Sequence, residues 1–153
     1  MVVITGARRA GKSTIVKQYI SQLHDRGIPA KNMLYFIFFI RQLDFLKNER
    51  KFFDCINQWE EKLDSSAPSF IIVDEVQELD NWDEIIASLV EDHTINSKII
   101  ITGSNSTLLA SEVSSKLSGR YYSLEVYPSD YSEFCEISEY DPNQMDSFKK
   151  FMR

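Results

Sequence analysis

The sequence has few of the residues that build disulfide frameworks and metal centres. Its two cysteines, Cys55 and Cys135, and its two histidines, His24 and His93, form no set with the spacing of a metal site. We therefore expect both cysteines to be unpaired thiols, as is usual in a reducing cytoplasm. The composition gives no support to a disulfide-stapled or zinc-binding fold.

An excess of positive charge is also absent. The net charge is −6, from 17 Lys and Arg against 23 Asp and Glu, and the isoelectric point is about 4.9. No cluster of basic residues stands out along the chain, so the sequence predicts no surface for nucleic acid.

Long hydrophobic runs are missing as well. The longest, MLYFIFFI at residues 33–40, is too short to cross a bilayer. The N-terminus lacks the charged and apolar regions of a signal peptide. We therefore expect a cytoplasmic protein with no membrane partner.

Apolar runs and helical patterns alternate along the 153 residues, 43% of which are hydrophobic. The runs expected to form strands are residues 2–5, 34–40, 70–75, 98–103 and 121–126. This alternation predicts one α/β domain, in which a mostly parallel five-stranded sheet carries helices on both faces. In the last run, Tyr122, Leu124 and Val126 alternate with polar residues, which predicts an edge strand with one face in solvent.

The helical segments between these runs carry apolar stripes with spacings of three and four residues. The stripes are Ile15, Val16, Tyr19, Ile20 and Leu23; Phe52, Ile56, Trp59 and Leu63; and Trp82, Ile85, Ile86, Leu89 and Val90. The first strand begins at residue 2, and a helical pattern still runs at Arg153. We expect residues 1–153 to be a single domain of a longer chain.

The segment GARRAGKS, from Gly6 to Ser13, fits the phosphate-loop pattern G-x-x-x-x-G-K-[ST] at every fixed position. It stands between a predicted strand and a predicted helix, as the pattern requires. In such a loop the glycines let backbone N–H groups approach phosphate oxygens, Lys12 reaches the β and γ phosphates, and Ser13 binds Mg²⁺. The alternative is a plain turn before a helix, with Lys12 in solvent. The residues expected to contact the nucleotide are Gly6, Ala7, Arg8, Arg9, Ala10, Gly11, Lys12, Ser13 and Thr14.

The two arginines inside the loop are not required by the pattern. We interpret Arg8 and Arg9 as solvent-facing or paired with an acidic neighbour, rather than catalytic.

Two carboxylates close the third predicted strand, IIVDE. Asp74 is expected at the carboxyl end of the sheet, where it would hold Mg²⁺ through water. Glu75 follows at once, where a carboxylate orients or deprotonates the water that attacks the γ phosphate. A strand that simply ends in polar residues is the structural alternative. Beside a phosphate loop, the pair predicts hydrolysis as well as binding.

Further polar residues follow the fourth strand and precede the fifth. Ser104 and Asn105 are candidates to bind the γ phosphate or the attacking water, although Asn105 or Ser106 is as well suited to cap the next helix. Arg120 is a candidate arginine finger, acting on the site of a neighbouring subunit; a surface ion pair is the alternative.

The ordered set of the phosphate loop, VDEVQELDNWDEII, ITGSNSTLLASEVSSKLSGR and YPSDYSEF resembles the prokaryotic predicted ATPases of the AAA+ superclass. In that family an AAA-type domain precedes a poorly characterised C-terminal domain. The resemblance covers Val2 to about Phe134. It implies a three-layer P-loop NTPase fold with strand order 5-1-4-3-2, and ATP as the nucleotide.

The resemblance also implies roles for individual residues. Lys12 and Ser13 would contact phosphate and Mg²⁺, Asp74 would be the Mg²⁺ partner and Glu75 the catalytic carboxylate. Ser104 and Asn105 would form the sensor region, and Arg120 the finger. The segment IRQLD departs from the family pattern, because it leaves only Asp44 where acidic residues are frequent after the second strand.

The leading hypothesis is a Mg²⁺-dependent ATP hydrolase that works as a homo-oligomer or with a protein partner, and that moves a C-terminal domain or that partner. One alternative is a switch or interaction module that binds ATP with little turnover. A small-molecule P-loop kinase is the other, although the scattered arginines suggest no arginine-rich lid.

Overall fold

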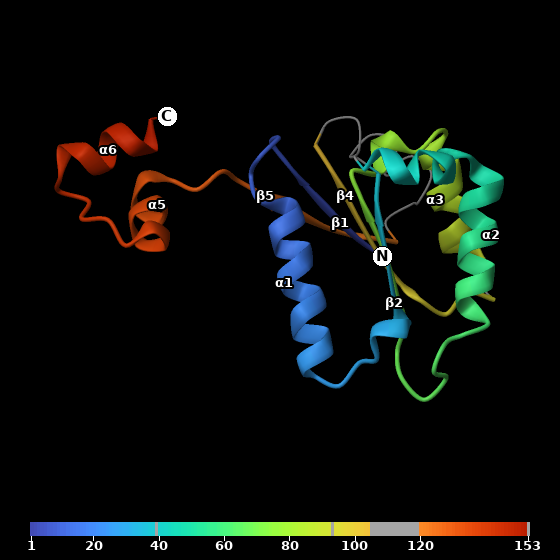
Figure 1. Cartoon of the computed structure of the whole chain (residues 1–153). Helices are drawn as coiled ribbons and strands as arrows, with labels where there is room; N and C mark the ends of the chain where they lie inside the picture. The colour runs from blue at the N-terminus through green and yellow to red at the C-terminus, as the bar shows by residue number, and fades with distance from the viewer. Residues whose placement is uncertain (39, 93, 105–119, 153) are drawn as a thin grey trace.

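The computed structural model describes residues 1–38, 40–92, 94–104 and 120–152 (Figure 1). Helices and strands alternate from residue 2 to residue 103, as the sequence predicts. In chain order they are β1 (Val2–Gly6), α1 (Lys12–Asp25), β2 (Met33–Ile37), α2 (Glu49–Glu60), β3 (Phe70–Asp74), α3 (Trp82–Glu91), β4 (Lys98–Gly103), β5 (Tyr122–Val126), α5 (Tyr131–Ser138) and α6 (Met145–Phe151). Short 3₁₀ turns cover Ala30–Asn32, Arg41–Lys47 and Val76–Glu78.

The five strands form one parallel sheet in the order β2-β3-β4-β1-β5. This is the predicted order read from the other edge, so the predicted α/β class and topology are confirmed. Strand β4 lies between β1 and β3. The carboxyl ends of β1, β3 and β4 therefore meet at one edge of the sheet, where the loops after them can build a common site.

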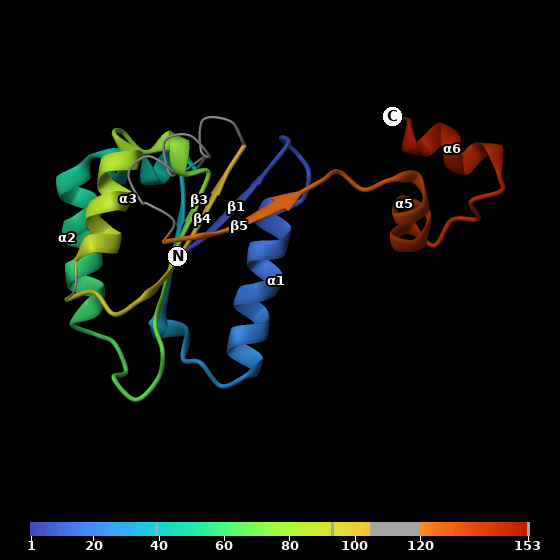
Figure 2. The same ribbon diagram turned by 180° about the vertical axis from the view of Figure 1, so that it is seen from behind.

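Helices cover both faces of the sheet (Figures 1 and 2). Helix α1 lies on one face, and α2 and α3 lie on the other. Along β3, Ile71 and Val73 belong to the core on the α2–α3 side, while Phe70 and Ile72 belong to the core on the α1 side. Because side chains alternate along a strand, Asp74 at the end of β3 lies on the α1 face.

Two predicted boundaries were wrong. Strand β2 ends at Ile37, three residues before the predicted end, although Phe38 is fully buried. The ring of Phe38 stacks on Phe36 and lies 6.3 Å from the ring of Phe52, so burial in the core persists after strand pairing stops. Helix α2 ends at Glu60, which leaves the predicted stripe residue Leu63 in the following turn.

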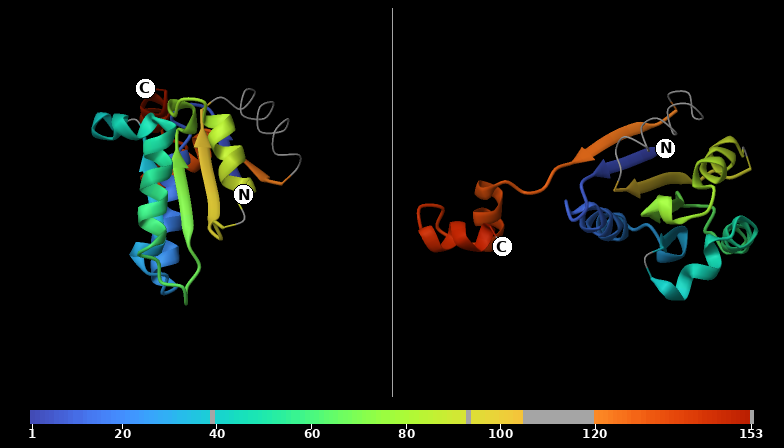
Figure 3. Two further views of the ribbon diagram at one scale, coloured as in Figure 1. Left: turned by 90° about the vertical axis from the view of Figure 1, so that its right-hand side faces the viewer. Right: turned by 90° about the horizontal axis from the view of Figure 1, so that it is seen from above.

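Strand β5 is at the predicted edge, but its burial differs from the prediction. Tyr122 is 81% and Leu124 48% exposed, so the apolar set does not form a buried face. The nearest described helix, α1, packs on β1 and its inner neighbours, and this leaves β5 largely uncovered within the described part of the chain (Figure 3).

Helices α5 and α6 form a hairpin that stands away from the sheet, as Figures 1 and 2 and the right-hand view of Figure 3 show. A separate aromatic cluster holds the two helices together. Tyr131 packs edge-on against Phe148 and Phe151, each with ring centroids 5.4 Å apart. Cys135, in α5, is buried, and both it and Cys55 are free thiols, as predicted.

Within the residues that the structure describes, none of the helices has both the length and the hydrophobicity needed to cross a membrane.

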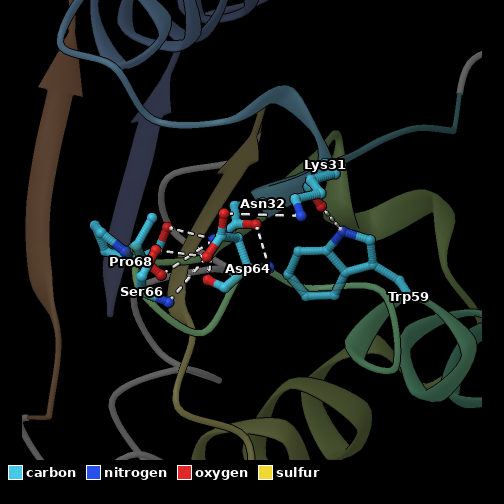
Figure 4. Close-up of polar contacts among 7 residues, drawn as sticks. Lys31, Asn32, Trp59, Asp64, Ser66 and Pro68 are labelled. Carbon is cyan, nitrogen blue, oxygen red and sulfur yellow. Dashed lines mark hydrogen bonds and ion pairs between the residues drawn. The ribbon is translucent and has the colours of Figure 1, made fainter.

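The side chain of Asn32 joins the segment before β2 to the loop before β3 (Figure 4). Its side chain is fully buried, and its amide nitrogen lies 2.9 Å from the Asp64 carbonyl and 3.1 Å from the Ala67 carbonyl, to which it donates. Its amide oxygen accepts from the Asp64 N–H at 2.9 Å. These hydrogen bonds connect the start of β2 to the loop before β3. They therefore support the register in which β2 pairs with β3.

We predict that Asn32→Ala lowers the free energy of unfolding by about 2–4 kcal/mol, because it leaves several buried backbone groups without partners. Urea unfolding measures this loss. Asn57→Ala is the control, because Asn57 is exposed on α2 and its removal is expected to change stability by less than about 0.5 kcal/mol. Equal effects of the two substitutions would contradict the structural role of Asn32.

Candidate functional site

The loop between β1 and α1 has the backbone that its glycines predict. Gly6 and Gly11 have φ angles of 145° and 97°, and Arg9 has 69°, in the left-handed region. A Cβ on Gly6 would lie 2.1 Å from the Val126 carbonyl oxygen, so only glycine fits against β5. The loop is closed by a hydrogen bond from the Ala10 N–H to the Ala7 carbonyl at 3.1 Å.

Helix α1 begins directly after this loop without a side-chain cap. Gly11 is its N-cap residue, and the first turn contains no acidic residue. The free N–H groups of that turn, together with the helix dipole, favour an anion at this position. Ser13 and Thr14 lie in the same turn.

Lys12 is the first residue of α1, and it is only 4% exposed. Its Nζ donates to the carbonyls of Gly6 at 3.0 Å and Ala7 at 2.9 Å. Both partners are neutral, and the structure shows no ion pair between Lys12 and a described carboxylate. A buried ammonium without a counter-charge is costly, so these residues fit an anionic ligand such as a nucleotide phosphate.

Asp74 is fully buried at the end of β3 and accepts hydrogen bonds from two hydroxyl groups. Tyr35, from β2, donates to its Oδ2 at 2.9 Å, and Thr102, from β4, donates to its Oδ1. All three side chains lie on the α1 face of the sheet, since Tyr35 packs in that core and Thr102 follows Ile100 by two residues.

The pKa of Tyr35 is raised well above its usual range. Burial of the phenol is the main cause, and the neighbouring Asp74 carboxylate adds to it by charge repulsion and by its hydrogen bond. Tyr35 therefore keeps its proton and remains a donor to Asp74 throughout the neutral and moderately alkaline range.

Glu75 is bound to the same threonine. Its backbone N–H donates to Thr102 Oγ1 at 3.0 Å, and its φ of 57° places a non-glycine residue in the left-handed region. This turn directs the chain away from β3. The carboxylate oxygen Oε2 accepts from Ser104 Oγ at 2.6 Å and from the Gln77 amide.

A cavity of about 400 Å³ opens over this edge of the sheet. Its described lining residues are Arg8, Arg9, Glu75, Gln77, Glu78 and Ser104. Two residues of the phosphate loop, Arg8 and Arg9, thus line the same cavity as Glu75 and Ser104, whereas Lys12, Ser13 and Asp74 are not among its described lining residues. Asn105, the other predicted sensor residue, lies outside the described residues.

Arg120 is not part of this cavity. The N-terminal amine of Met1 donates to the Arg120 carbonyl at 3.4 Å, so Arg120 lies at the beginning of β1 and β5. The phosphate loop lies at the other end, and the four residue steps from Tyr122 to Val126 alone span about 13 Å of strand. Within one chain, Arg120 and the loop lie at opposite ends of the sheet.

The sequence analysis missed Tyr35, Thr102 and Gln77. Each carried a weak signal. Thr102 is a polar residue in the mainly apolar strand KIIITG. Tyr35 has the polar side-chain group, a hydroxyl, of the strand MLYFI, and Gln77 follows Glu75 by two residues. Which carboxylate each one reaches depends on the pairing of strands far apart in the sequence.

The donor set also bears on magnesium. Among the described residues no three His, Cys, Asp or Glu side chains come close enough to hold a metal ion alone. Mg²⁺ is commonly held by one or two carboxylates together with substrate phosphates, and the Asp74 carboxylate and the Ser13 hydroxyl suit that mode.

The chain belongs to the AAA domain family, whose model matches residues 1–135. An uncharacterized protein of Haemophilus influenzae is 36% identical over 140 residues, which are 91% of this chain and 34% of the relative. The uncharacterized protein MJ1544 of Methanocaldococcus jannaschii is 29% identical over 143 residues, 91% of this chain and 29% of the relative. The chain thus spans about a third of the length of the curated relatives it matches.

The solved structure of C. elegans PCH-2 has a similar fold. Its TM-score is 0.59 at 21% identity, and the match covers 90% of this chain and 38% of that one. At this identity the likeness supports the fold. Family membership confirms the resemblance found in the sequence, and at the level of the family it supports ATP binding and hydrolysis.

The contact between Gly6 and β5 predicts unequal costs for two glycine substitutions. Gly11→Ala should lower the free energy of unfolding by about 1 kcal/mol. Alanine is strained at the φ of this position, but its Cβ would meet nothing within 4 Å. Gly6→Ala adds a clash with the Val126 carbonyl and should cost about 3 kcal/mol or more. Chemical denaturation of both variants measures the difference, and equal losses would disprove the clash.

The hydroxyl of Tyr35 predicts a stability difference that depends on pH. Tyr35→Phe should cost about 1.5–3 kcal/mol at pH 7, because it removes a hydrogen bond to a buried carboxylate. The folded pKa is raised, so this contribution is complete below the unfolded pKa of about 10 and is lost as pH rises further.

Denaturant unfolding of wild type and Tyr35→Phe between pH 7 and pH 11 tests this. The difference in free energy of unfolding between the two proteins should be constant to about pH 9 and decrease above about pH 10. Tyr19→Phe is the control, because the Tyr19 hydroxyl makes no hydrogen bond within the described chain. A gap that widens with pH would overturn the assignment.

Proposed function

We propose that this chain is the ATPase domain of a longer protein and that it binds and hydrolyses Mg²⁺-ATP. The observation that carries the proposal is the double contact of Thr102, which bonds to the Asp74 carboxylate and to the Glu75 backbone. It fixes two acidic residues at the sheet edge that also carries the phosphate loop. Fixed carboxylates beside a phosphate site suit hydrolysis better than binding alone.

Nucleotide binding would use the loop and the first turn of α1. Lys12 would exchange its two carbonyl partners for phosphate oxygens, which are charged and therefore stronger acceptors. The backbone N–H groups of Gly11, Lys12 and Ser13 would surround the same anion, whereas the Thr14 N–H already donates to the Gly11 carbonyl. The expectation that the bound nucleotide carries adenine rests on membership of the AAA domain family.

Mg²⁺ would be held by the Ser13 hydroxyl and, through water, by Asp74. Bound Mg²⁺ neutralises charge that develops on the phosphate oxygens. The hydroxyls of Tyr35 and Thr102 would keep the Asp74 carboxylate in one orientation when the ion enters. They are positioning residues in this scheme, because neither touches the nucleotide.

Glu75 would act on the attacking water. Its carboxylate lines the cavity and accepts two hydrogen bonds on Oε2, from Ser104 and Gln77. In this position it can accept the proton of a water molecule, or orient it in line with the γ phosphate. Ser104, which donates to the Glu75 carboxylate, would sense the γ phosphate.

Arg120 is suited to act only on the site of another copy. It lies at the opposite end of its own sheet from the phosphate loop, so a finger role requires a homo-oligomer. Hydrolysis would then move the remaining two thirds of the longer protein, or a partner protein, in keeping with the length of the relatives.

Two other functions are compatible with a phosphate loop. A small-molecule kinase usually carries its acidic strand next to β1, whereas here β4 separates β3 from β1, so the topology disfavours a kinase. A switch that binds ATP without turnover would have the same loop and Asp74. The fixed position of Glu75 favours hydrolysis over the switch.

Glu75→Gln should lower Mg²⁺-ATP turnover by about 10²–10⁴-fold, because the amide cannot accept a proton. ATP affinity should change little, since Glu75 does not hold the phosphates. Turnover is measured by phosphate release at several protein concentrations, and affinity by calorimetric titration. Glu61→Gln, an exposed residue at the end of α2, is the matched control. Tight ATP binding by a wild type that shows no turnover would support the switch.

A further inference from the structure

The two arginines of the phosphate loop line the cavity that contains Glu75. Arg8 and Arg9 are both exposed, and both line this cavity together with Glu75 and Glu78. This position is not dictated by the loop pattern, which leaves both residues free to vary. It places two guanidinium groups beside the carboxylate expected to act on water.

Neither arginine is paired with a carboxylate in the described structure. The acidic residues of the cavity have other partners: Glu75 accepts from Ser104 and Gln77, and Glu78 lies 3.7 Å from Lys47. Of the two roles expected from the sequence, a solvent-facing position or a bridge to an acidic neighbour, the described residues show the first, since both arginines are exposed. Among the described residues, neither guanidinium group that lines the cavity has a carboxylate partner.

The backbone that carries the two arginines is held by contacts within the loop. Arg9 has a φ of 69°, which costs a residue with a Cβ roughly 1 kcal/mol relative to glycine. The adjacent turn is closed by the Ala10 to Ala7 hydrogen bond, and Lys12 bonds to the Ala7 carbonyl next to Arg8. The arginines therefore project from a fixed loop and not from a long surface segment.

We propose that Arg8 and Arg9 bind the γ-phosphoryl oxygens of ATP from within the same chain. This inference rests on the proposed function and names the residues that would recognise the terminal phosphate. Charge spreads over those oxygens in the transition state, and a guanidinium group can bind two of them at once. The role is the one first assigned to Arg120, which lies at the far end of the sheet.

Two consequences follow. The site distinguishes ATP from ADP, because only ATP carries the group that the arginines bind. Hydrolysis also proceeds within one copy of the chain, so turnover per molecule does not rise with protein concentration, in contrast to a site completed by a neighbour's arginine.

The test measures binding separately from turnover. Arg8→Ala, Arg9→Ala and the double variant are made in the Glu75→Gln background, which preserves ATP, and the dissociation constants of Mg²⁺-ATP and Mg²⁺-ADP are measured by calorimetry. The double variant should bind ATP at least about 10-fold more weakly, with a change of less than about 3-fold for ADP. Arg26→Ala, which removes an exposed arginine at the far end of α1, is the matched control.

Turnover is then measured with Glu75 intact. The double variant should lose about 10³-fold or more of wild-type turnover, and lysines at both positions should restore only a part of it, because an ammonium cannot bind two oxygens in a fork. Wild-type turnover per molecule should be the same across a 100-fold range of protein concentration.

Three results are decisive. Equal weakening of ATP and ADP binding would overturn the proposal, because the arginines would then attract phosphates in general. Turnover per molecule that rises with concentration and vanishes in Arg120→Ala would overturn it as well, in favour of a neighbour's arginine. If wild type shows no turnover but the double variant selectively loses ATP affinity, hydrolysis is refuted and the recognition of the γ phosphate by Arg8 and Arg9 stands.

Discussion

The hydroxyl group of Thr102 is the contact on which the arrangement of the site depends. It accepts the Glu75 N–H and donates to the Asp74 carboxylate, so one buried atom at the end of β4 fixes two consecutive residues at the end of β3. Tyr35, from β2, completes the set of donors around Asp74. Three neighbouring strands therefore have to be in register before the acidic pair takes its position. The hydrophobic core on either side of β3 supplies that register, and the site is a consequence of the sheet.

The local parts of the structure could be predicted from the sequence. Residue patterns of short range define the phosphate loop, the buried strands and the acidic pair, and Gly6, Lys12 and Asp74 lie where their motifs predict. The strand order came from the resemblance and is confirmed. The contacts of Thr102, Tyr35 and Gln77 could not be predicted, because each depends on which strands or turns are neighbours. The early end of β2 was missed for a related reason, since Phe38 continues the apolar run as a core residue without strand pairing.

Arg120 and the loop arginines show the same limit for charged residues. In the sequence Arg120 precedes the fifth strand, and Arg8 and Arg9 are variable positions of a motif, so the pattern favours Arg120 as the functional residue. In the structure β5 runs parallel to β1, and its beginning lies at the opposite end of the sheet from the phosphate loop. Arg120 precedes β5, and the phosphate loop follows the neighbouring parallel strand β1. The length of a strand therefore separates them. Parallel topology therefore removes Arg120 from its own site and leaves Arg8 and Arg9 beside it.

The same pairing connects the loop to the rest of the chain. Gly6 lies so close to the Val126 carbonyl that no side chain fits between them, and Val126 is the last residue of β5. Four residues after Val126, Asp130 is the N-cap of α5 and forms a capping box with Glu133. A displacement of Gly6 when Lys12 exchanges carbonyl for phosphate oxygens would press on the backbone of β5, since interiors packed this closely transmit small shifts. The route from the phosphate loop to the α5–α6 hairpin is thus one steric contact and one short connection, so the pairing of β1 with β5 links the proposed nucleotide site directly to the last two helices of the chain.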